Sequence, residues 1–314
     1  MNAFISVVGQ DAAVNLLQSA IAKQRIAPAY LFVGPSGIGK SLTAQAFIEA
    51  LFCHGLSEAD ALVTKQRLRD RNHPDVLWIE PTYSHQGQRL TVAEAAEAGL
   101  KRKTPPQIAI SQIRDLNPFL GRPPLWANRS LVAIDQAQTM AEAAANALLK
   151  TLEEPGKATL ILIAPSVSAL LPTIISRCAV VPFYRLGTEA MAKVLKRQAY
   201  GNLLERPEIL ALAQGSPGEA IAAWEQMQAI PPNLLEKLAT PPQTCRSALE
   251  LAKDVDKILD TEAQLWLIDY LQQSYWRKNY PVSLLQALET ARRQLLSYAN
   301  PRLVWEVMLM GMCA

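Results

Sequence analysis

Eight consecutive residues near the N-terminus have the types and the spacing that bind a phosphate group. They match the pattern GxxxxGK[ST] at every fixed position and are Gly34, Pro35, Ser36, Gly37, Ile38, Gly39, Lys40 and Ser41. Glycines let backbone N–H groups curl around an anion, the lysine meets the outer phosphates, and the serine hydroxyl can hold Mg²⁺. The pattern predicts a site for ATP or ADP with Mg²⁺; a glycine-rich turn that binds nothing is the alternative.

A carboxylate suited to the same metal ion follows an apolar run at 131–134. This residue, Asp135, is predicted to hold Mg²⁺ together with Ser41, although a strand-end aspartate can instead cap the helix that follows. The next residue is Gln136, whose amide cannot accept a proton from an attacking water. Because general-base assistance contributes ~10² to 10⁴ in rate, Gln136 predicts nucleotide binding with little hydrolysis.

The elements that must position these residues are those of an α/β domain. Apolar residues recur at helical spacing over 12–22 and again over 42–52, and 30–33 is a short apolar strand candidate. Together they form the strand, loop and helix unit that holds a phosphate. A further strand is expected at 76–79, after a turn at 72–75.

Beyond Pro182 the pattern becomes helical throughout. Segments 187–201 and 207–224 predict a small helical lid, and Pro231-Pro232 predicts a linker. The rest predicts a helical bundle with Trp266, Trp276 and Trp305 in its core. The helices of this bundle are expected at 249–259, 262–276, 282–298 and 303–312. The predicted domains are therefore residues 1–184, 185–228 and 229–314.

Composition excludes few functions for this chain of 314 residues with a net charge of +3. No apolar run approaches the ~20 residues that a membrane span needs, so we expect a cytoplasmic protein without membrane contact. Its four cysteines lie far apart without CxxC spacing, which predicts reduced thiols and no zinc site. Segment 81–107 is predicted to be an exposed insertion, in which Lys101, Arg102 and Lys103 favour a solvated charge cluster over a DNA contact.

Two long runs, 145–155 and 170–178, resemble the AAA+ ATPase core of bacterial clamp-loader subunits. Shorter matches at 7–10, 215–220 and 299–303 extend the resemblance over nearly the whole chain. It implies an α/β AAA+ phosphate-loop domain with a parallel sheet flanked by helices, then a small helical lid domain and an all-α collar domain. It also implies that Val8 lines an adenine pocket.

The same resemblance assigns a role to Arg177 in the motif Ser176-Arg177-Cys178. In that family this arginine projects into the nucleotide site of the neighbouring subunit, and an arginine finger contributes ~10³ to 10⁵ in turnover. A surface arginine that caps a helix C-terminus is the alternative. Departures from the family's motor subunits imply that the chain's own ATPase is weak or absent. These are Gln136, the lack of a hydroxyl at Ala164 and Pro165, and Gly218 in place of a sensing arginine.

The resemblance thus implies a non-motor subunit of a pentameric replicative clamp loader. Such a subunit joins gamma/tau motor subunits and a delta subunit and helps them to load the sliding clamp on primed DNA. Two alternatives stay open: a competent ATPase of the motor type, and a scaffold whose phosphate loop is empty. An acidic residue at position 136 would favour the first, and nucleotide titration of the isolated chain distinguishes the second.

Overall fold

The computed structural model describes residues 3–85, 88–98 and 105–313. It divides into two compact units, residues 1–190 and 191–314. The first unit contains all strands of the described chain, and the second contains helices and one 3-10 turn. The predicted division into three domains remains a prediction. No helix in the described ranges has the length and apolar character needed to cross a membrane.

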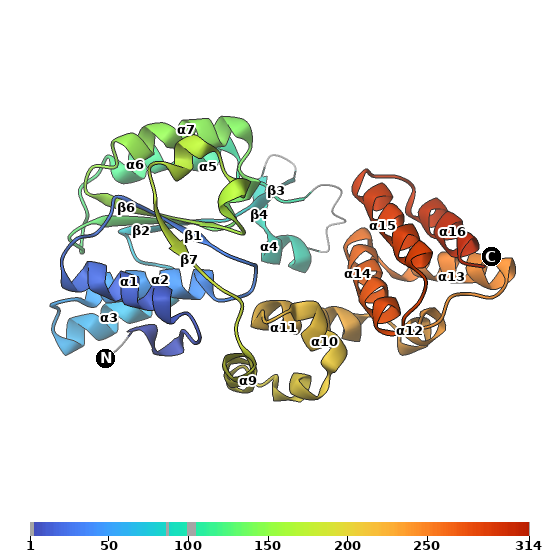
Figure 1. The fold of residues 1–314 in the computed structure, drawn as a ribbon. Coiled ribbons are helices and arrows are strands. Elements are labelled where there is room, and N and C mark those ends of the chain that lie inside the picture. The colour runs from blue at the N-terminus through green and yellow to red at the C-terminus, as the bar shows by residue number, and fades with distance from the viewer. Residues whose placement is uncertain (1–2, 86–87, 99–104, 314) are drawn as a thin grey trace. The chain divides into compact units, whose positions relative to one another are not determined.

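A five-stranded parallel sheet forms the centre of the first unit (Figure 1). All residues of its three inner strands are buried, as expected for a parallel sheet covered on both faces. In spatial order the strands are β2 (Val76–Ile79), β5 (Ser130–Ile134), β6 (Ala158–Ala164), β1 (Ala29–Val33) and β7 (Ala179–Pro182). The predicted strands at 30–33 and 76–79 and the apolar run at 131–134 are confirmed as β1, β2 and β5.

Helices cover both faces of this sheet (Figure 1). One face carries α1 (Asp11–Ala22), α2 (Lys40–Cys53) and α3 (Glu58–Arg69). The other carries α5 (Ile110–Arg114), α6 (Leu116–Leu120) and α7 (Glu142–Glu153). The short helix α8 (Pro172–Ile175) precedes β7. This layered arrangement is the predicted α/β fold, and it places the carboxyl ends of the parallel strands at one edge.

The predicted turn at 72–75 contains a buried carboxylate that organises a second loop. Asp75 is 2% exposed, and its carboxylate accepts backbone hydrogen bonds of 2.7–2.8 Å from Leu125, Trp126 and Ala127. Burial acts to raise the pKa of Asp75, but these three N–H groups and nearby His73 outweigh it and lower the pKa. Asp75 therefore fixes the loop that enters β5.

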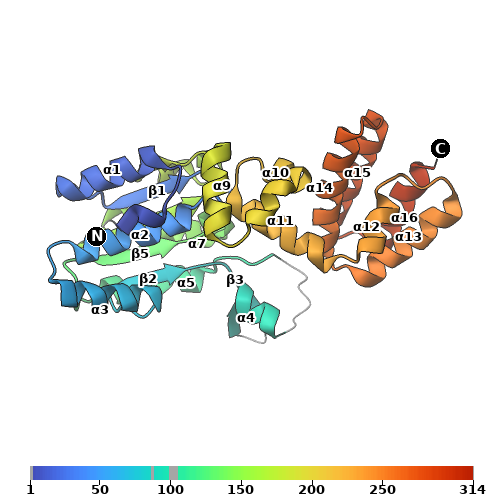
Figure 2. The same ribbon diagram turned by 90° about the horizontal axis from the view of Figure 1, so that it is seen from below.

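The insertion between β2 and β5 begins with a two-stranded antiparallel sheet. Its strands are β3 (Thr82–His85) and β4 (Gln88–Thr91), and α4 (Val92–Glu97) follows. Figure 2 shows this segment projecting from the main sheet. The predicted charge cluster at Lys101, Arg102 and Lys103 lies outside the described residues.

The second unit is helical, as predicted, but two details differ. The predicted stretch 207–224 is two helices, because Gln214 and Gly215 adopt positive φ angles of 47° and 84° and end the first one. Pro232 does not lie in a linker; it begins a helix, where its missing N–H costs nothing. After α9 (Thr188–Arg197), which spans the boundary of the units, the helices are α10 (Pro207–Ala213), α11 (Pro217–Ala229), α12 (Pro232–Leu238), α13 (Cys245–Ile258), α14 (Thr261–Arg277), α15 (Val282–Leu296) and α16 (Pro301–Gly311).

Helices α12 to α16 share one apolar core. Trp305 is fully buried there, and its indole N–H donates a 2.9 Å hydrogen bond to the side-chain oxygen of Gln264. Trp266 packs against the core and stacks on Tyr270. The expectation that Trp276 is a core residue is wrong: its side chain is 64% exposed, on the outer face of α14.

Candidate nucleotide-binding site

The phosphate loop runs from the end of β1 to the start of α2 and depends on its glycines. Gly39, the residue before α2, has a φ of 96°, a left-handed conformation that favours glycine. A Cβ atom at Gly34 would lie 2.4 Å from the carbonyl oxygen of Phe183, so a larger residue would displace the backbone after β7. The loop is thus held between β1 and the chain that leaves β7.

Lys40 lies inside this loop. The residue is 8% exposed, and its ammonium donates hydrogen bonds of 2.6 and 2.5 Å to the carbonyl oxygens of Gly34 and Pro35. An ammonium in this position carries the positive charge to the centre of the loop, beside the N-terminus of α2. A phosphate bound in the loop would therefore meet both charges.

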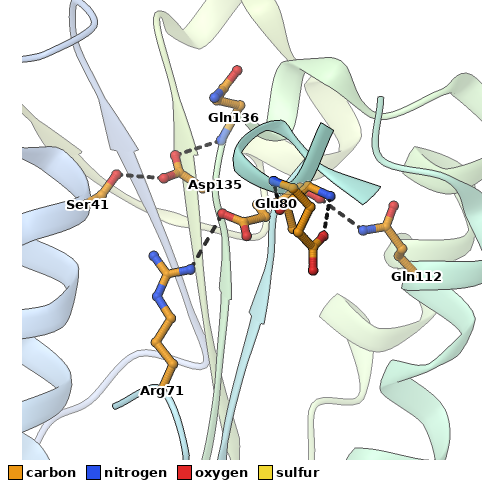
Figure 3. A network of polar contacts seen from close by, with 8 residues as sticks. Ser41, Arg71, Glu80, Gln112, Asp135 and Gln136 are labelled. Carbon is orange, nitrogen blue, oxygen red and sulfur yellow. Dashed lines mark hydrogen bonds and ion pairs between the residues drawn. The ribbon is translucent and has the colours of Figure 1, made fainter. Parts of the chain in front are cut away.

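The two predicted Mg²⁺ ligands lie side by side (Figure 3). The Ser41 hydroxyl donates a 2.8 Å hydrogen bond to Asp135 Oδ2, although Ser41 lies in the first turn of α2 and Asp135 follows β5. The other carboxylate oxygen of Asp135 accepts a 2.8 Å bond from the backbone N–H of Gln136. Hydroxyl and carboxylate oxygens are ligands that Mg²⁺ prefers, so the pair fits the predicted ion.

A cavity of about 450 Å³ opens between the phosphate loop and the ends of β5 and β6. This volume falls in the range of small-molecule sites. Its lining includes most of the predicted phosphate and Mg²⁺ ligands, and it also includes three positions from which the sequence predicts weak hydrolysis, Gln136, Ala164 and Pro165. The lining residues are Ser36, Gly37, Gly39, Lys40, Ser41, Leu42, Asp135, Gln136, Gln138, Ile163, Ala164 and Pro165.

Four predicted binding residues, Gly34, Pro35, Ile38 and Val8, do not line this cavity. Ile38 is buried behind the loop, and Val8 is half-buried. Gln138 lines the cavity, and its side-chain oxygen is buried without a hydrogen-bond partner in the described part of the chain.

Sequence reasoning missed the role of Gln10 in holding the loop. Gln10 is 3% exposed, and its amide N–H₂ donates to the carbonyl oxygens of Ile38 at 3.2 Å and Tyr184 at 2.7 Å. Its side-chain oxygen accepts a 3.1 Å bond from the Tyr184 backbone N–H. Gln10 therefore ties the phosphate loop to the chain that follows β7. The burial of Gln10 is the feature that reveals this role, and the sequence shows neither the burial nor the hydrogen-bond partners of a glutamine.

Glu80 is a second residue that sequence reasoning missed (Figure 3). The Asp135 backbone N–H bonds to the Ile79 carbonyl at 2.8 Å, so β2 and β5 leave the sheet together and Glu80 follows at the same edge. The Glu80 carboxylate pairs with Arg71 at 3.5 Å, and Gln112 donates a 2.9 Å bond to the Glu80 backbone oxygen. Strand pairing places this carboxylate near the site, and sequence order alone does not.

Arg177 follows α8, on the surface of the first unit. Its guanidinium donates a 2.7 Å hydrogen bond to the Glu153 carboxylate at the end of α7 and a 2.9 Å hydrogen bond to the carbonyl oxygen of Thr173 within the four-residue helix α8. The side chain keeps 35% exposure, and among the described residues Arg177 is not part of the cavity lining. The hydrogen bond to the Thr173 carbonyl agrees with the predicted alternative, an arginine that caps a helix C-terminus. The rest of the guanidinium faces Glu153 and solvent.

The other motif residue, Cys178, is packed into the core beneath α7. Burial raises the pKa of its thiol to about 11, so Cys178 stays protonated and unreactive near neutral pH. Among the described residues, no three His, Cys, Asp or Glu side chains gather where they could hold a metal ion. The absence of zinc remains an expectation.

The parallel sheet, the phosphate loop and the strand-end aspartate define a phosphate-loop protein of the AAA+ type. A family model described as "DNA polymerase III, delta subunit" matches residues 9–187, and one described as "Cyanobacterial DNA polymerase III delta prime, C-terminal domain" matches residues 189–312. The chain belongs to the DNA polymerase III delta-prime family of bacterial clamp-loader subunits.

Similar proteins agree with this family. DNA polymerase III subunit delta' of Bacillus subtilis (strain 168) is 32% identical over 215 residues, which are 68% of this chain and 58% of that protein. The corresponding protein of Pseudomonas aeruginosa is 36% identical over 61% of this chain and 54% of its own length. The chain thus spans little more than half the length of these relatives.

One solved structure shows the same fold. It is a DNA polymerase III gamma subunit-related protein from Thermotoga maritima, with a TM-score of 0.53 and 21% identity. The comparison covers 96% of this chain and 99% of that one. At this identity the likeness supports the AAA+ fold and the helical C-terminal region, both of which the sequence predicted.

Proposed function

We propose that this chain is the delta-prime-like subunit of a replicative clamp loader. It holds a Mg²⁺-nucleotide in its own cavity with little turnover and supplies Arg177 to the site of a neighbouring motor subunit. In the assembled pentamer with gamma/tau and delta subunits, it helps to load the sliding clamp on primed DNA. The exposed position of Arg177, outside its own nucleotide cavity, is the observation that carries this proposal.

The proposed nucleotide site is supported by the grouped phosphate and Mg²⁺ ligands. Lys40 supplies positive charge inside the loop, and Ser41 and Asp135 are already within 2.8 Å of each other. Bound Mg²⁺ would neutralise phosphate charge there, and this chain's residues would orient both groups. These contacts favour a filled site over an empty scaffold.

Weak hydrolysis is supported by the other side of the same cavity. Gln136 offers an amide where a general base would act, and Ala164 with Pro165 forms an apolar end of β6 without a hydroxyl. Phosphoryl transfer depends on electrostatic positioning, so losses at these positions compound. Binding energy from the loop is unaffected, because it acts on phosphates that both the ground state and the transition state share.

The role of Arg177 in trans is supported by the exposed contacts that hold its guanidinium. Glu153 and Thr173 hold the guanidinium at the surface through two contacts that use separate nitrogens. Exposed ion pairs of this kind contribute little to stability, ~0 to 1 kcal/mol, so a neighbour's phosphate can replace Glu153 at small cost. A planar guanidinium binds phosphate oxygens in bidentate fashion.

Entry into the complex is proposed to use the helical second unit as a collar. Three apolar side chains repeat along the outer face of α16 at positions i, i+4 and i+7: Leu303, Val307 and Met310. Their exposures are 57%, 63% and 37%, while the opposite face is buried. An apolar stripe on a well-packed helix marks an interaction surface, and a partner helix would cover it.

Glu80 favours a second candidate, a competent motor-type ATPase. It is a carboxylate at the edge of the sheet that holds Asp135, and it offers the acid–base group that Gln136 lacks. Turnover of the isolated chain distinguishes this candidate from the delta-prime-like role.

A reconstitution tests the proposal as a whole. The chain is mixed with gamma/tau and delta subunits, sliding clamp and primed DNA, and DNA-stimulated ATPase is measured with and without it. We expect the full rate only when the chain is present, and little ATPase from the chain alone. Equal rates without the chain would contradict the proposed function.

A further inference from the structure

Two cysteines that are distant in sequence meet in the second unit. Cys245 is the first residue of α13, and Cys313 follows the end of α16. The Cys313 thiol interacts with the Cys245 thiol directly and also donates a 3.3 Å hydrogen bond to the Leu309 carbonyl. Because the start of one helix meets the end of the other, α13 and α16 run antiparallel.

The two helices that carry these cysteines pack against each other. In both views α13 and α16 lie side by side (Figures 1 and 2), and they share the apolar core of the unit. Ala248 lies one turn after Cys245, and Met312 lies directly before Cys313; both are buried in that core. Packing of α13 against α16 thus brings the two cysteine positions near each other.

The remaining cysteines of the described chain lie in the first unit. Cys178 and Cys53 are both half-buried; burial raises the pKa of Cys178, and the Cys53 thiol is directed at the Ala61 carbonyl. By contrast, Cys245 is exposed and accessible to small reagents. Cys313 is half-buried, and burial with the neighbouring Cys245 raises its pKa. A reagent therefore reaches the exposed Cys245 thiol first.

We propose that Cys245 and Cys313 are a reversible oxidation site that forms a disulfide between the ends of α13 and α16. The oxidant is a low-molecular-weight disulfide such as oxidised glutathione. The Cys245 thiolate attacks one sulfur of the oxidant, forms a mixed disulfide and releases one glutathione thiol. The Cys313 thiolate then attacks Cys245 Sγ, forms the internal bond and releases the second. Two electrons and two protons pass from the protein to the oxidant.

Such a bond changes the stability of the second unit. It joins residues that are far apart in the chain, so it removes much conformational freedom from the unfolded state. The oxidised chain should therefore unfold at a temperature higher by roughly 5 to 15 °C than the reduced chain. The inference does not depend on the proposed clamp-loading role.

Thiol counting on the full chain tests this site. The protein is equilibrated with excess oxidised or reduced glutathione, alkylated under denaturing conditions, and mapped by mass spectrometry. We expect the wild type to lose two alkylatable thiols together and to yield a peptide pair joined through Cys245 and Cys313, with reversal by dithiothreitol.

Cys245→Ser and Cys313→Ser should each abolish the internal bond and the thermal shift, and Cys53→Ser should keep both. Four free thiols in excess oxidised glutathione, or a bond between other cysteines or between chains, would overturn the proposal.

Discussion

The Ser41 hydroxyl and the Asp135 carboxylate are joined by a 2.8 Å hydrogen bond, although 94 positions separate them in the chain. Ser41 lies in the first turn of α2, and Asp135 follows β5. Their meeting depends on the order of strands in the sheet, which brings the phosphate loop to the same edge as the Mg²⁺ aspartate. Binding of Mg²⁺-nucleotide should therefore depend on both residues as a pair.

The first prediction concerns nucleotide affinity. Lys40→Ala removes the charge inside the loop, and a charge-assisted hydrogen bond contributes ~1.5 to 3 kcal/mol, so affinity for Mg·ADP should fall about 10- to 100-fold. Ser41→Ala should weaken binding with Mg²⁺ more than binding in a chelator, because it removes an ion ligand. Calorimetric titration measures both. Unchanged affinity of both variants would indicate that the loop binds no nucleotide.

A second prediction addresses hydrolysis by the isolated chain. Gln136→Glu restores a carboxylate beside Asp135 and should raise steady ATPase, although the absence of a hydroxyl at Ala164 limits the gain to less than the ~10² to 10⁴ of a full general base. Glu80→Gln should leave the slow wild-type rate within about twofold. A large loss in Glu80→Gln, with nucleotide affinity intact, would instead favour the motor-type candidate.

The third prediction concerns stability and its pH dependence. Asp75→Ala leaves three N–H groups of the 125–127 loop without their acceptor and should lower the free energy of unfolding by about 3 kcal/mol or more at pH 7. The folded pKa of Asp75 is lowered, so its contribution is present above the usual pKa of ~3.9 and is lost as the pH falls through the folded value.

Urea unfolding at neutral and acidic pH measures this effect. Asp70→Ala is the matched control, since Asp70 is exposed and its carboxylate accepts hydrogen bonds from the Gln66 side-chain amide. The control should change stability by less than about 0.5 kcal/mol. A cost for Asp75→Ala no larger than that of the control would show that the 125–127 loop does not need its carboxylate.

A fourth prediction tests the collar surface. Val307→Asp places a charge in the exposed stripe of α16 without disturbing the buried face, so the chain should fold normally yet fail to enter the complex. Leu62→Asp on α3, at a similarly exposed position, is the control and should assemble. Size-exclusion chromatography with the partner subunits measures entry. Co-elution of Val307→Asp with a full complex would exclude α16 from the interface.

Much of the site could be predicted from sequence because the ligands belong to continuous motifs. The loop 34–41 is recognised by its motif, and Asp135 by the apolar run before it. The helices of the second unit are recognised by apolar residues that recur at helical spacing. Gln10, Glu80 and Asp75 could not be predicted in the same way. Their partners lie on distant segments, and their roles arise from burial and strand order. Pro232 was misassigned because proline ends helices and also begins them.

The most direct test of the account is the activity of a complex that contains Arg177→Ala. We expect this variant to bind nucleotide and to assemble as the wild type does, since Arg177 lies outside the chain's own cavity and its contacts, an ion pair with Glu153 and hydrogen bonds to Thr173 and Ser176, are exposed. DNA-stimulated ATPase and clamp loading should fall, because a finger that contributes ~10³ to 10⁵ at one interface is lost, with part of the loss masked by the other motor sites. Arg177→Lys should rescue poorly, since an ammonium lacks the planar fork. Normal assembly of Arg177→Ala with full ATPase and loading rates would contradict the account and leave Arg177 as a structural arginine.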